Sequence, residues 1–421
     1  MSKTPRKTPI AAIKGTKDIL PSEVKKWQRV EAAARNLFEL YGYGEIRTPL
    51  FESTELFEKG TGETSDIVTK EMYTFIDKGG RSITLRPEYT PSVVRAIIEH
   101  RLYLEPQPQR FYFIGPMFRY DKPQKGRYRQ FHQVDIEVFG EKDPAVDAEI
   151  VEMANAVLQR LGVKGIDILV NSVGCRQCRP AYHKRLQAEV ENIHGSLCED
   201  CKRKTSVNPL RIFDCKVPGC RTVSESLPKI KDYLCPDCEA HFSSFCSYLD
   251  QYGIVFRIEP RLVRGLDYYT KTTFEFVTQA LGAQDAILGG GRYDDMMKQF
   301  GGPDMCGIGF AMGLERFLAV VPDREEPKDF VYIVHVGEEA KKIGMGLARY
   351  LRGYEIECLA EYKTRNMRNQ ISRASKLKAS WAVIIGEDEV REGRFQLKNM
   401  ETGEQRALTR EGIVAAVQKA L

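Results

Sequence analysis

The stretch Phe118-Arg-Tyr-Asp-Lys-Pro-Gln-Lys-Gly-Arg-Tyr-Arg-Gln-Phe-His-Gln-Val-Asp-Ile-Glu137 predicts a β-hairpin with a distinctive face. One strand ends at Arg119, a basic loop with a proline and a glycine follows, and a second strand begins near Phe131. Because alternate residues of a strand point to the same side, one face carries an aromatic ring, an amide and two carboxylates: Phe131, Gln133, Asp135 and Glu137. A guanidinium, a cationic loop and a ring suit a nucleotide. The alternative is an ordinary hairpin with a solvated basic turn.

Strand-like and helical runs extend outward from this hairpin. Apolar residues at helical spacing predict a helix from about Ser22 to Tyr41. Further strands are expected at 83–85, 110–115, 134–139 and 167–170, with a helix at about 145–161 between the last two. The strand at 134–139 alternates apolar and acidic residues, which is typical of a half-buried antiparallel strand.

Composition limits the class of protein. A length of 421 residues suggests two or three domains, and 42% hydrophobic with 29% charged residues excludes wholesale disorder. A net charge of +5 does not by itself indicate a nucleic-acid partner. The sequence shows no secretory signal and no apolar run of membrane-spanning length, so we expect no membrane association and a cytoplasmic location.

A cysteine-rich insertion is expected at 174–250. Nine of the 11 cysteines lie there, eight of them in four close pairs. CxxC pairs in a reducing compartment favour tetrahedral Zn²⁺ over disulfides, although reduced thiols packed in a small helical module remain an alternative. The preferred zinc site combines pairs near the ends of the entering and leaving helices: Cys198, Cys201, Cys235 and Cys238. A second set would then be Cys175, Cys178, Cys215 and Cys220.

The C-terminal part reads as a separate domain. A charged segment between Pro322 and Pro327 predicts a linker, and strands then alternate with helices, which indicates a small parallel-sheet α/β domain. A run from Lys363 to Lys378 carries several cations and no acid. That run is either a solvated helix face or a phosphate-binding surface.

Three further glycine- and arginine-containing motifs accompany the hairpin: Arg264-Gly-Leu-Asp-Tyr-Tyr269, Gly289-Gly-Gly-Arg-Tyr-Asp294 and Gly307-Ile-Gly-Phe-Ala-Met-Gly-Leu-Glu-Arg316. With Gly44-Glu-Ile-Arg-Thr-Pro-Leu-Phe-Glu52 and Leu85-Arg-Pro-Glu-Tyr-Thr90, their order resembles the class II aminoacyl-tRNA synthetases. The segment 44–52 is similar to motif 1, the hairpin to motif 2 and 309–316 to motif 3. The other three stretches resemble the histidyl-tRNA synthetases of bacterial type.

The resemblance implies an α+β fold, in which an antiparallel sheet is flanked by helices. The catalytic domain would comprise 1–173 and 251–325, interrupted by the insertion at 174–250. An anticodon-binding domain would follow at 328–421. The implied partners are ATP with Mg²⁺, L-histidine, tRNA-His and a second copy of the chain.

The resemblance also implies roles in activation. Arg119 would bind the α-phosphate, Phe131 would stack on adenine, and Arg316 would bind the γ-phosphate, with Arg127 also in the ATP site. Arg264 would lie between the histidine carboxylate and the α-phosphate, so Arg264 and Arg119 are the expected catalytic residues.

The resemblance further implies that a set of polar side chains recognises histidine. Glu88, Thr90 and Gln133 would bind the α-amino group, while Glu137 and Tyr269 would bind the imidazole nitrogens. Tyr268 and Tyr293 would line the pocket. Two positions depart from the family pattern: Asp121 stands where motif 2 usually has glutamate, and Tyr89 stands where many relatives have glycine.

For tRNA, the expected contacts are Lys122, Gln124 and Arg129 in the hairpin loop and Lys363, Arg365 and Arg368 in the C-terminal domain. The alternative function is a non-catalytic, histidine-sensing regulatory subunit of ATP phosphoribosyltransferase. Such paralogues generally lack the C-terminal domain and the ATP-binding arginines, both of which this sequence retains.

Overall fold

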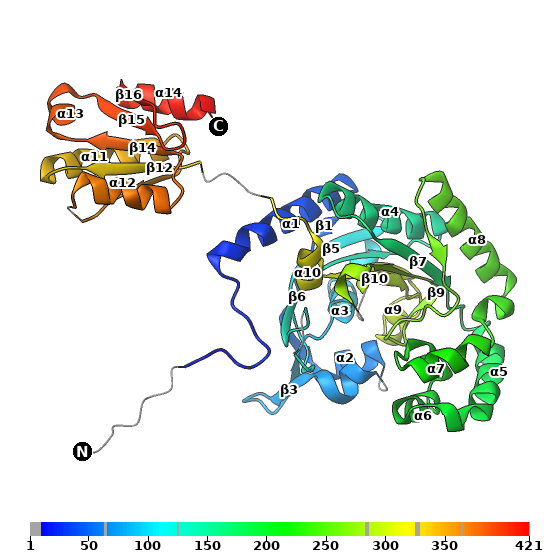
Figure 1. The fold of residues 1–421 in the computed structure, drawn as a ribbon. Helices are drawn as coiled ribbons and strands as arrows, with labels where there is room; N and C mark the ends of the chain where they lie inside the picture. The colour runs from blue at the N-terminus through cyan, green and yellow to red at the C-terminus, as the bar shows by residue number, and fades with distance from the viewer. Residues whose placement is uncertain are drawn as a thin grey trace, which may run out of the picture. The chain divides into compact units, whose positions relative to one another are not determined.

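The protein consists of two compact units, Met1–Pro322 and Asp323–Leu421 (Figure 1). The structure is a computed structural model and describes residues 10–62, 65–123, 126–282, 286–324, 329–363 and 365–420.

An eight-stranded sheet forms the centre of the first unit. Its strands, in spatial order, are β1 (Gly44–Glu45), β5 (Gln109–Phe118), β6 (Gln130–Phe139), β11 (Gly307–Gly313), β10 (Ala286–Arg292), β9 (Thr270–Val277), β7 (Asp167–Ser172) and β8 (Arg257–Ile258). The outermost pairs, β1–β5 and β7–β8, are parallel, and the pairs between them are antiparallel. The antiparallel sheet flanked by helices that the sequence predicts is therefore confirmed.

One face of this sheet is covered by helices. These are α1 (Pro21–Leu40), α4 (Pro144–Arg160), α8 (Pro236–Gln251) and α10 (Leu314–Val320) (Figure 1). Helix α1 packs against α4, α10 and β5, and its apolar side belongs to the hydrophobic core that also contains Val134, Ile136 and Val138 of β6. The neighbouring β6 residues point to the other face, so the period-two pattern separates a helix-covered side from a polar side.

The polar side is partly closed by a second group of elements. Helices α3 (Thr90–Glu99) and α9 (Met296–Gln299) share a hydrophobic cluster with Phe113 and Met117 of β5. Beyond them lie α2 (Thr54–Thr61), the π-helical turn η1 (Ile67–Glu71) and a small antiparallel sheet of β2 (Phe51–Ser53), β4 (Ser82–Leu85) and β3 (Tyr73–Ile76).

The cysteine-rich segment folds as short helices around its own hydrophobic cluster. Its helices are α5 (Arg179–Asn192), α6 (Glu199–Thr205) and α7 (Pro218–Val223), with 3₁₀ turns at His194–Ser196, Pro209–Asp214, Ser224–Ser226 and Ile230–Tyr233. Helix α8 then leads back to the main sheet, where Phe245 and Leu249 join the central core.

The second unit is a five-stranded sheet with helices. The strand order is β13 (Cys358–Ala360), β12 (Val331–His335), β14 (Trp381–Ile385), β15 (Phe395–Asn399) and β16 (Gln405–Leu408). Its helices are α11 (Glu338–Arg352), α12 (Met367–Lys376), α13 (Glu387–Glu392) and α14 (Arg410–Ala420).

The expectation of an all-parallel sheet is wrong for the last two strands of this unit. Strands β12 to β14 are parallel, but β15 and β16 add an antiparallel hairpin after β14. Gly403, with φ +77°, lies in the turn between them. Both strands are short and β16 is largely exposed, which leaves little hydrophobic signal in the sequence.

Among the described residues, no helix combines the length and apolar character needed to cross a bilayer.

Candidate active site

Three neighbouring strands form the floor of a cavity on the polar side of the main sheet. In the registers of β6 with β11 and β11 with β10, Glu137 is opposite Gly309, and Gly309 is opposite Gly291. Likewise Gln133 is opposite Gly313, and Ala311 is opposite Gly289. Directly paired residues project from the same face of a sheet. Polar β6 side chains therefore stand beside strands with almost no side chains of their own, which leaves room for a ligand.

Gly309 shows why this floor requires glycine. A Cβ atom at that position would lie 2.1 Å from Glu137 Oε2 and 2.2 Å from the carbonyl oxygen of Ile136. The close approach of the two strands thus depends on the missing side chain.

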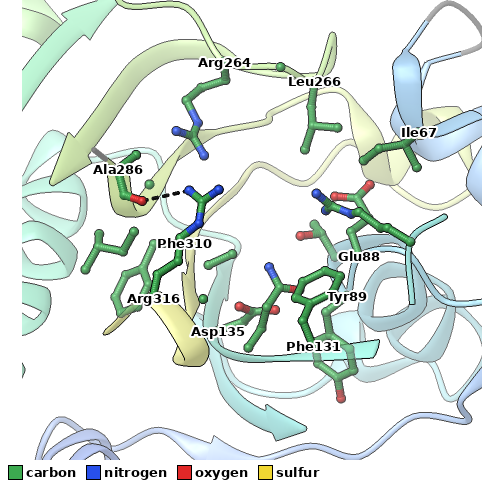
Figure 2. Close-up of a pocket in the computed structure, with 18 of the residues that line it drawn as sticks. Ile67, Glu88, Tyr89, Phe131, Asp135, Arg264, Leu266, Ala286, Phe310 and Arg316 are labelled. Carbon is green, nitrogen blue, oxygen red and sulfur yellow. Dashed lines mark hydrogen bonds between the residues drawn. The ribbon is translucent and has the colours of Figure 1, made fainter. Parts of the chain in front are cut away.

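The structure brings the expected ATP and histidine residues to one cavity of about 370 Å³, open to solvent (Figure 2). The sequence-predicted side chains that line it are Glu88, Thr90, Arg119, Arg127, Phe131, Gln133, Glu137, Arg264, Tyr268, Tyr269, Tyr293 and Arg316. They come from segments far apart in the chain, and their roles remain predictions.

One end of the cavity is strongly acidic. Glu88, Asp135 and Glu137 are all buried there. Burial raises the pKa of Glu88 to about 7 and that of Glu137 to about 8, and it raises the pKa of Asp135 well above its usual range. Three buried carboxyl groups near one another disfavour each other's charge, so this end favours a cationic ligand.

Several buried acceptors at this end have no protein partner. Glu88 Oε1, Gln133 Oε1 and Asp135 Oδ1 make no hydrogen bond. Buried polar atoms are normally satisfied, and leaving them unpaired is costly. A ligand that presents several N–H donors, such as an ammonium group or an imidazole, would satisfy them.

The remaining carboxylate oxygens are positioned by hydroxyl groups. Thr90 Oγ1 donates to Glu137 Oε1 at 2.5 Å, and Tyr293 donates to Glu137 Oε2. Tyr268 donates to Glu88 Oε2 at 3.1 Å. The Tyr268 ring packs at 4.6 Å from that of Tyr269 and at 5.7 Å, edge to face, from that of Tyr293. Three tyrosine rings therefore enclose the acidic end.

Arg264 points into the cavity from above the glycine strands (Figure 2). Its Nη1 is paired with Glu275 of β9, whereas its Nε makes no hydrogen bond. A Cβ atom on Gly289 would lie 2.2 Å from Arg264 Nη1, so the glycine at 289 makes the space that this guanidinium occupies. The guanidinium is thus held between Glu275 and the glycine strand β10 on the cavity wall.

Two more arginines line the cavity, and Arg119 lies close to Glu88. Arg119 donates from Nε to the carbonyl of Pro87 at 2.8 Å, and its guanidinium lies 5.3 Å from the centroid of the Phe131 ring. Arg316 donates to the carbonyl of Ala286 at 3.1 Å (Figure 2). Guanidinium groups around an aromatic ring suit a nucleotide triphosphate.

The two departures from the family pattern have structural explanations. Asp121 forms an ion pair with Arg127 at 2.7 Å, which holds the hairpin loop. Tyr89 is stacked on Phe113 with centroids 3.6 Å apart, and its hydroxyl donates to the carbonyl of Ile46. Tyr89 thereby ties the cavity wall to the segment that resembles motif 1.

Some lining residues had no role in the sequence interpretation. Asp135 belongs to the alternating strand pattern, but nothing in that pattern indicates its burial. Arg211 and Asp214 reach the cavity from the cysteine-rich segment, and no spacing pattern could have indicated that. Glu315 also lines it and accepts hydrogen bonds from the backbone and ring of His132 at 3.0 Å, which indicates a structural role for that histidine.

The expected tRNA contacts lie elsewhere in the molecule. Lys122 is exposed, and the Arg129 guanidinium lies over the Tyr120 ring at 3.9 Å. Gln124 lies outside the described residues. In the second unit, Lys363, Arg365 and Arg368 are all exposed.

The buried side chain of Glu361 holds the segment before these cations in place. Glu361 is buried, accepts hydrogen bonds from the backbone of Tyr362 and Lys363 at 3.1 and 3.2 Å, and pairs with Arg373 at 3.3 Å. Tyr362 is 72% exposed, so a fixed loop presents an aromatic ring beside the cations.

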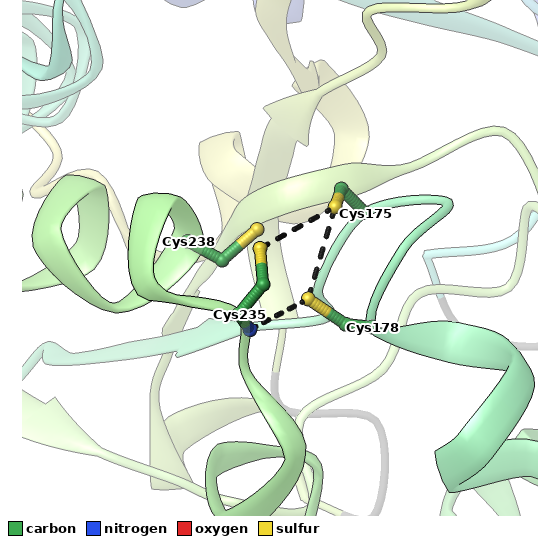
Figure 3. Close-up of side chains that lie close together, drawn as sticks. All are labelled: Cys175, Cys178, Cys235 and Cys238. Atoms are coloured by element: carbon green, nitrogen blue, oxygen red, sulfur yellow. Dashed lines mark hydrogen bonds between the residues drawn. The ribbon is translucent and has the colours of Figure 1, made fainter.

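The cysteines form two clusters, but not with the pairing expected from the sequence. Cys175, Cys178, Cys235 and Cys238 lie together (Figure 3), and Cys198, Cys201, Cys215 and Cys220 form the other group. The expected set of Cys198, Cys201, Cys235 and Cys238 is therefore wrong, as is the set of Cys175, Cys178, Cys215 and Cys220. The physical reason is that α5 begins and α8 begins beside each other, so the outermost pairs meet at the base of the insertion and the inner pairs meet within it.

Comparison with known proteins agrees with this geometry. The model of the family described as "Histidyl-tRNA synthetase" matches residues 15–178 and 223–317, and that of an anticodon-binding domain matches 330–420. The histidine–tRNA ligase of Halothermothrix orenii is 47% identical over 416 residues, covering 97% of this chain and 99% of that protein. That of Desulforamulus reducens is 48% identical over 412 residues, covering 96% and 98%.

Solved structures give the same result. The apo histidyl-tRNA synthetase of S. aureus covers 97% of this chain and 100% of its own, with a TM-score of 0.83 and 36% identity. A Bacillus halodurans protein titled as an ATP phosphoribosyltransferase regulatory subunit/histidyl-tRNA synthetase shares the fold at a TM-score of 0.65 and 19% identity. Both family models match, and the curated relatives align over nearly the whole chain. The chain therefore belongs to the histidyl-tRNA synthetase family.

Proposed function

We propose that this chain is a histidine–tRNA ligase. It would activate L-histidine with ATP to form histidyl-adenylate and pyrophosphate, and then transfer histidine to the 3′ end of tRNA-His. The observation that carries the proposal is a single cavity that combines buried carboxyl groups and unpaired acceptors with the guanidinium groups of Arg119, Arg264 and Arg316. Such a cavity accepts a cationic amino acid and a polyphosphate side by side.

In the activation step, a histidine carboxylate oxygen attacks the α-phosphorus, and the bond from that phosphorus to the pyrophosphate oxygen breaks. The nucleophile is already an anion at neutral pH, so no general base is needed. Arg119 and Arg264 would neutralise the charge that builds on the α-phosphoryl oxygens, and Arg316 would bind the leaving pyrophosphate. Catalysis then comes from positioning and cationic stabilisation.

ATP would enter as its magnesium complex. The carboxylate of Glu315, which adjoins Arg316 on the cavity wall, fits the oxygen donors that Mg²⁺ prefers. The ion would shield the charge of the outer phosphates.

Selection of histidine would depend on hydrogen bonding to both ends of the amino acid. Glu88, Thr90 and Gln133 would bind the α-ammonium, and Glu137 and Tyr269 the imidazole, with Tyr268 and Tyr293 as the walls. An amino acid without ring nitrogens would leave buried groups unpaired, which can give discrimination of roughly 10⁴-fold or more.

For the transfer step, the cationic hairpin loop with Lys122, Gln124 and Arg129 would meet the acceptor end. The exposed cations Lys363, Arg365 and Arg368 would contact anticodon phosphates. The exposed ring of Tyr362 adds a stacking surface for a base.

A homodimer is the proposed assembly. The small sheet presents an exposed apolar face beside motif 1, on which Phe51 and Phe75 are 53% and 47% exposed. The pairing of Ser53 with Ile83 and of Ile83 with Phe75 places these rings on one face. A contiguous apolar face of this kind is typical of an isologous interface.

A cytoplasmic location is proposed on the basis of the cysteines. All 11 are free thiols in the structure, eight of them clustered, which suits a reducing compartment. The family's ligase function and the retained Arg119, Arg264 and Arg316 disfavour the regulatory-subunit alternative.

The test is ATP–pyrophosphate exchange with purified protein against each of the twenty amino acids, with and without tRNA. Exchange with histidine alone is expected. Exchange with a different amino acid would overturn the pocket assignment, and tight histidine binding without any exchange would favour the regulatory alternative.

A further inference from the structure

We infer that each four-cysteine cluster binds one Zn²⁺, and that the two ions hold the insertion against the loop that carries Arg264 to Tyr269. The inference about that loop rests on the proposed function, whereas the metal sites do not. The cluster of Cys175, Cys178, Cys235 and Cys238 is called the base cluster, and that of Cys198, Cys201, Cys215 and Cys220 the inner cluster.

The base cluster has the geometry of a tetrathiolate site (Figure 3). Cys175 Sγ lies 3.7 Å from Cys178 Sγ and 3.8 Å from Cys235 Sγ, and all four sulfurs lie within 4.8 Å of one another. Tetrahedral Zn²⁺ with bonds of about 2.3 Å keeps its sulfurs about 3.8 Å apart. Disulfide sulfurs would be about 2.05 Å apart, so these are thiols placed for a shared ion.

Backbone amides support the sulfurs of both clusters. The N–H of Cys235 donates to Cys178 Sγ at 3.1 Å, and that of Gln177 donates to Cys175 Sγ at 3.4 Å. In the inner cluster the N–H of Cys198 donates to Cys220 Sγ at 3.2 Å, and Cys198 Sγ lies 3.9 Å from Cys215 Sγ. Such donors orient metal-bound sulfurs and stabilise their negative charge.

The inner part of the insertion has too small a hydrophobic core to be rigid without a further constraint. Helices α6 and α7 have only seven and six residues, and the local hydrophobic cluster includes Cys201 and Cys220 among its few buried members. Segments this small do not bury enough apolar surface to be rigid, and a structural metal commonly supplies the missing constraint.

The inner cluster holds a segment that reaches the histidine loop. Between Cys201 and Cys215, Asn208 and Arg211 donate to Asp267 Oδ1 at 2.9 and 2.8 Å. Asp267 belongs to the Arg264–Tyr269 motif, and the Arg211 side chain is only 10% exposed. From the same lobe, Lys204 pairs at 2.7 Å with Asp66, which lines the active-site cavity.

The base cluster reaches the same loop from the other side. Arg179 directly follows Cys178 and donates to the carbonyl of Tyr269 and, at 3.1 Å, to that of Val173. The two metal-held segments therefore contact the loop near its middle and at its end. Arg211 is a positioning residue for histidine recognition, not a catalytic residue.

Metal content tests the sites independently of activity. The full-length enzyme, purified from zinc-supplemented cells and dialysed against a mild chelator, is expected to hold two Zn²⁺ per chain by mass spectrometry of the metal. Co²⁺ exchanged into the protein should give the absorption bands of tetrahedral thiolate ligation. Fewer than two ions in the wild-type protein would overturn the inference.

The double variant Cys198→Ser/Cys235→Ser tests the pairing. It removes one ligand from each cluster, so zinc should fall from two to none that survives dialysis. One retained Zn²⁺ would mean that both cysteines serve a single ion and would overturn the pairing. The control Cys246→Ser, a cysteine outside both clusters, should keep two ions. Circular dichroism must show native helix content in each variant, and reversible chelation and reloading of the wild type repeats the test without mutation.

The positioning role is tested by Arg211→Gln in histidine-dependent pyrophosphate exchange. The KM for histidine should rise about tenfold because a buried, charged hydrogen bond is lost, while the KM for ATP and the zinc content stay unchanged. Arg211→Lys should recover part of the affinity. An unchanged histidine KM would overturn the link from the insertion to the loop, whereas absence of exchange in the wild type would count against the proposed function and leave the metal count standing.

Discussion

Arg292 is fully buried and donates from Nε to both carboxylate oxygens of Asp147, at 3.1 and 3.3 Å. The same carboxylate accepts a hydrogen bond from His241 Nε2 of α8 at 2.9 Å. The arginine of the Gly-Gly-Arg-Tyr-Asp motif therefore points away from the ligand cavity and joins β10 to α4 and to the helix that leaves the insertion. The neighbouring guanidinium overrides burial and lowers the pKa of Asp147.

Replacing Arg292 by leucine should destabilise the protein strongly. The change leaves a buried carboxylate without its main partner, which typically costs about 3–5 kcal/mol. Urea unfolding followed by fluorescence measures the loss. The surface variant Arg391→Leu, whose pair with Asp388 is largely exposed, should change stability by less than about 1 kcal/mol. A similar loss in both variants would contradict the structural role.

Removing the Arg264 side chain should slow the formation of histidyl-adenylate without weakening the binding of histidine. Arg264→Ala takes away a cation that would stabilise the transition state, so the rate of pyrophosphate exchange should fall about 100- to 1000-fold. Histidine affinity by calorimetry should change only slightly. Normal turnover would refute the role given to this residue.

Gly289→Ala should reproduce part of that defect without altering any functional group. The new methyl would occupy the space of the Arg264 guanidinium, since a Cβ would lie 2.2 Å from Nη1. Exchange activity should drop at least tenfold, whereas the control Gly346→Ala, at a position with no atom within 4 Å of an added Cβ, should behave as wild type. Equal activity of both variants would contradict the packing argument.

Histidine activation should strengthen as the pH rises through about 7 to 8. The pKa of Glu88 is raised to about 7 and that of Glu137 to about 8, so these carboxyl groups ionise in that window and can then bind an ammonium. The ratio kcat/KM for histidine should increase accordingly. Glu88→Gln should lower the ratio and remove the pH dependence contributed by the lower pKa; an unaltered pH profile in this variant would argue against its part in binding.

The stability of the ligand-free protein should change in the opposite direction. Because the folded-state pKa values lie above the ordinary value of 4.5, the native state binds more protons than the unfolded state between pH 4.5 and 8. Stability contributed by these groups is therefore present at low pH and lost as the pH rises. Thermal melts should show the decline, and Glu88→Gln should reduce it. A decline of equal size in wild type and variant would assign it to other groups.

The exposed cations of the second unit should matter for tRNA alone. Changing Lys363, Arg365 and Arg368 together to glutamine should lower kcat/KM for tRNA and flatten its salt dependence by about two units of slope. Pyrophosphate exchange should not change. The matched triple variant of Lys342, Arg391 and Arg406, cations paired with acids on the same unit, should leave tRNA charging nearly intact. Equal losses in both triples would indicate a general charge effect.

Much of this fold could be predicted because its signals are local. Alternating residues placed Val134, Ile136 and Val138 on one side of a strand and Gln133, Asp135 and Glu137 on the other, and the core confirms that division. Helical spacing located α1, whose apolar side is buried. The hairpin of β15 and β16 was missed because its short strands bury few residues.

The candidate site was predicted from motif order, and the structure brings the expected ATP and histidine residues to one cavity. The burial of Asp135 and the structural use of Arg292 could not be predicted, because they depend on distant segments: β11 lies beside Asp135, and α4 supplies Asp147 to Arg292. A motif names the residue type, while its environment determines whether the side chain faces a ligand or a buried partner.

The sequence by itself determined the family motifs, the main helices and strands, and the concentration of cysteines in one insertion. Only the tertiary structure decided which cysteines meet and where Arg211 lies. Close spacing brings the cysteines of each pair together locally, but which pair meets which depends on how the insertion folds, with the start of α5 beside the start of α8. In the same way, the contact between Arg211 and Asp267 joins residues 56 positions apart. Such contacts arise from chain packing in space, and local sequence patterns carry no signal for them.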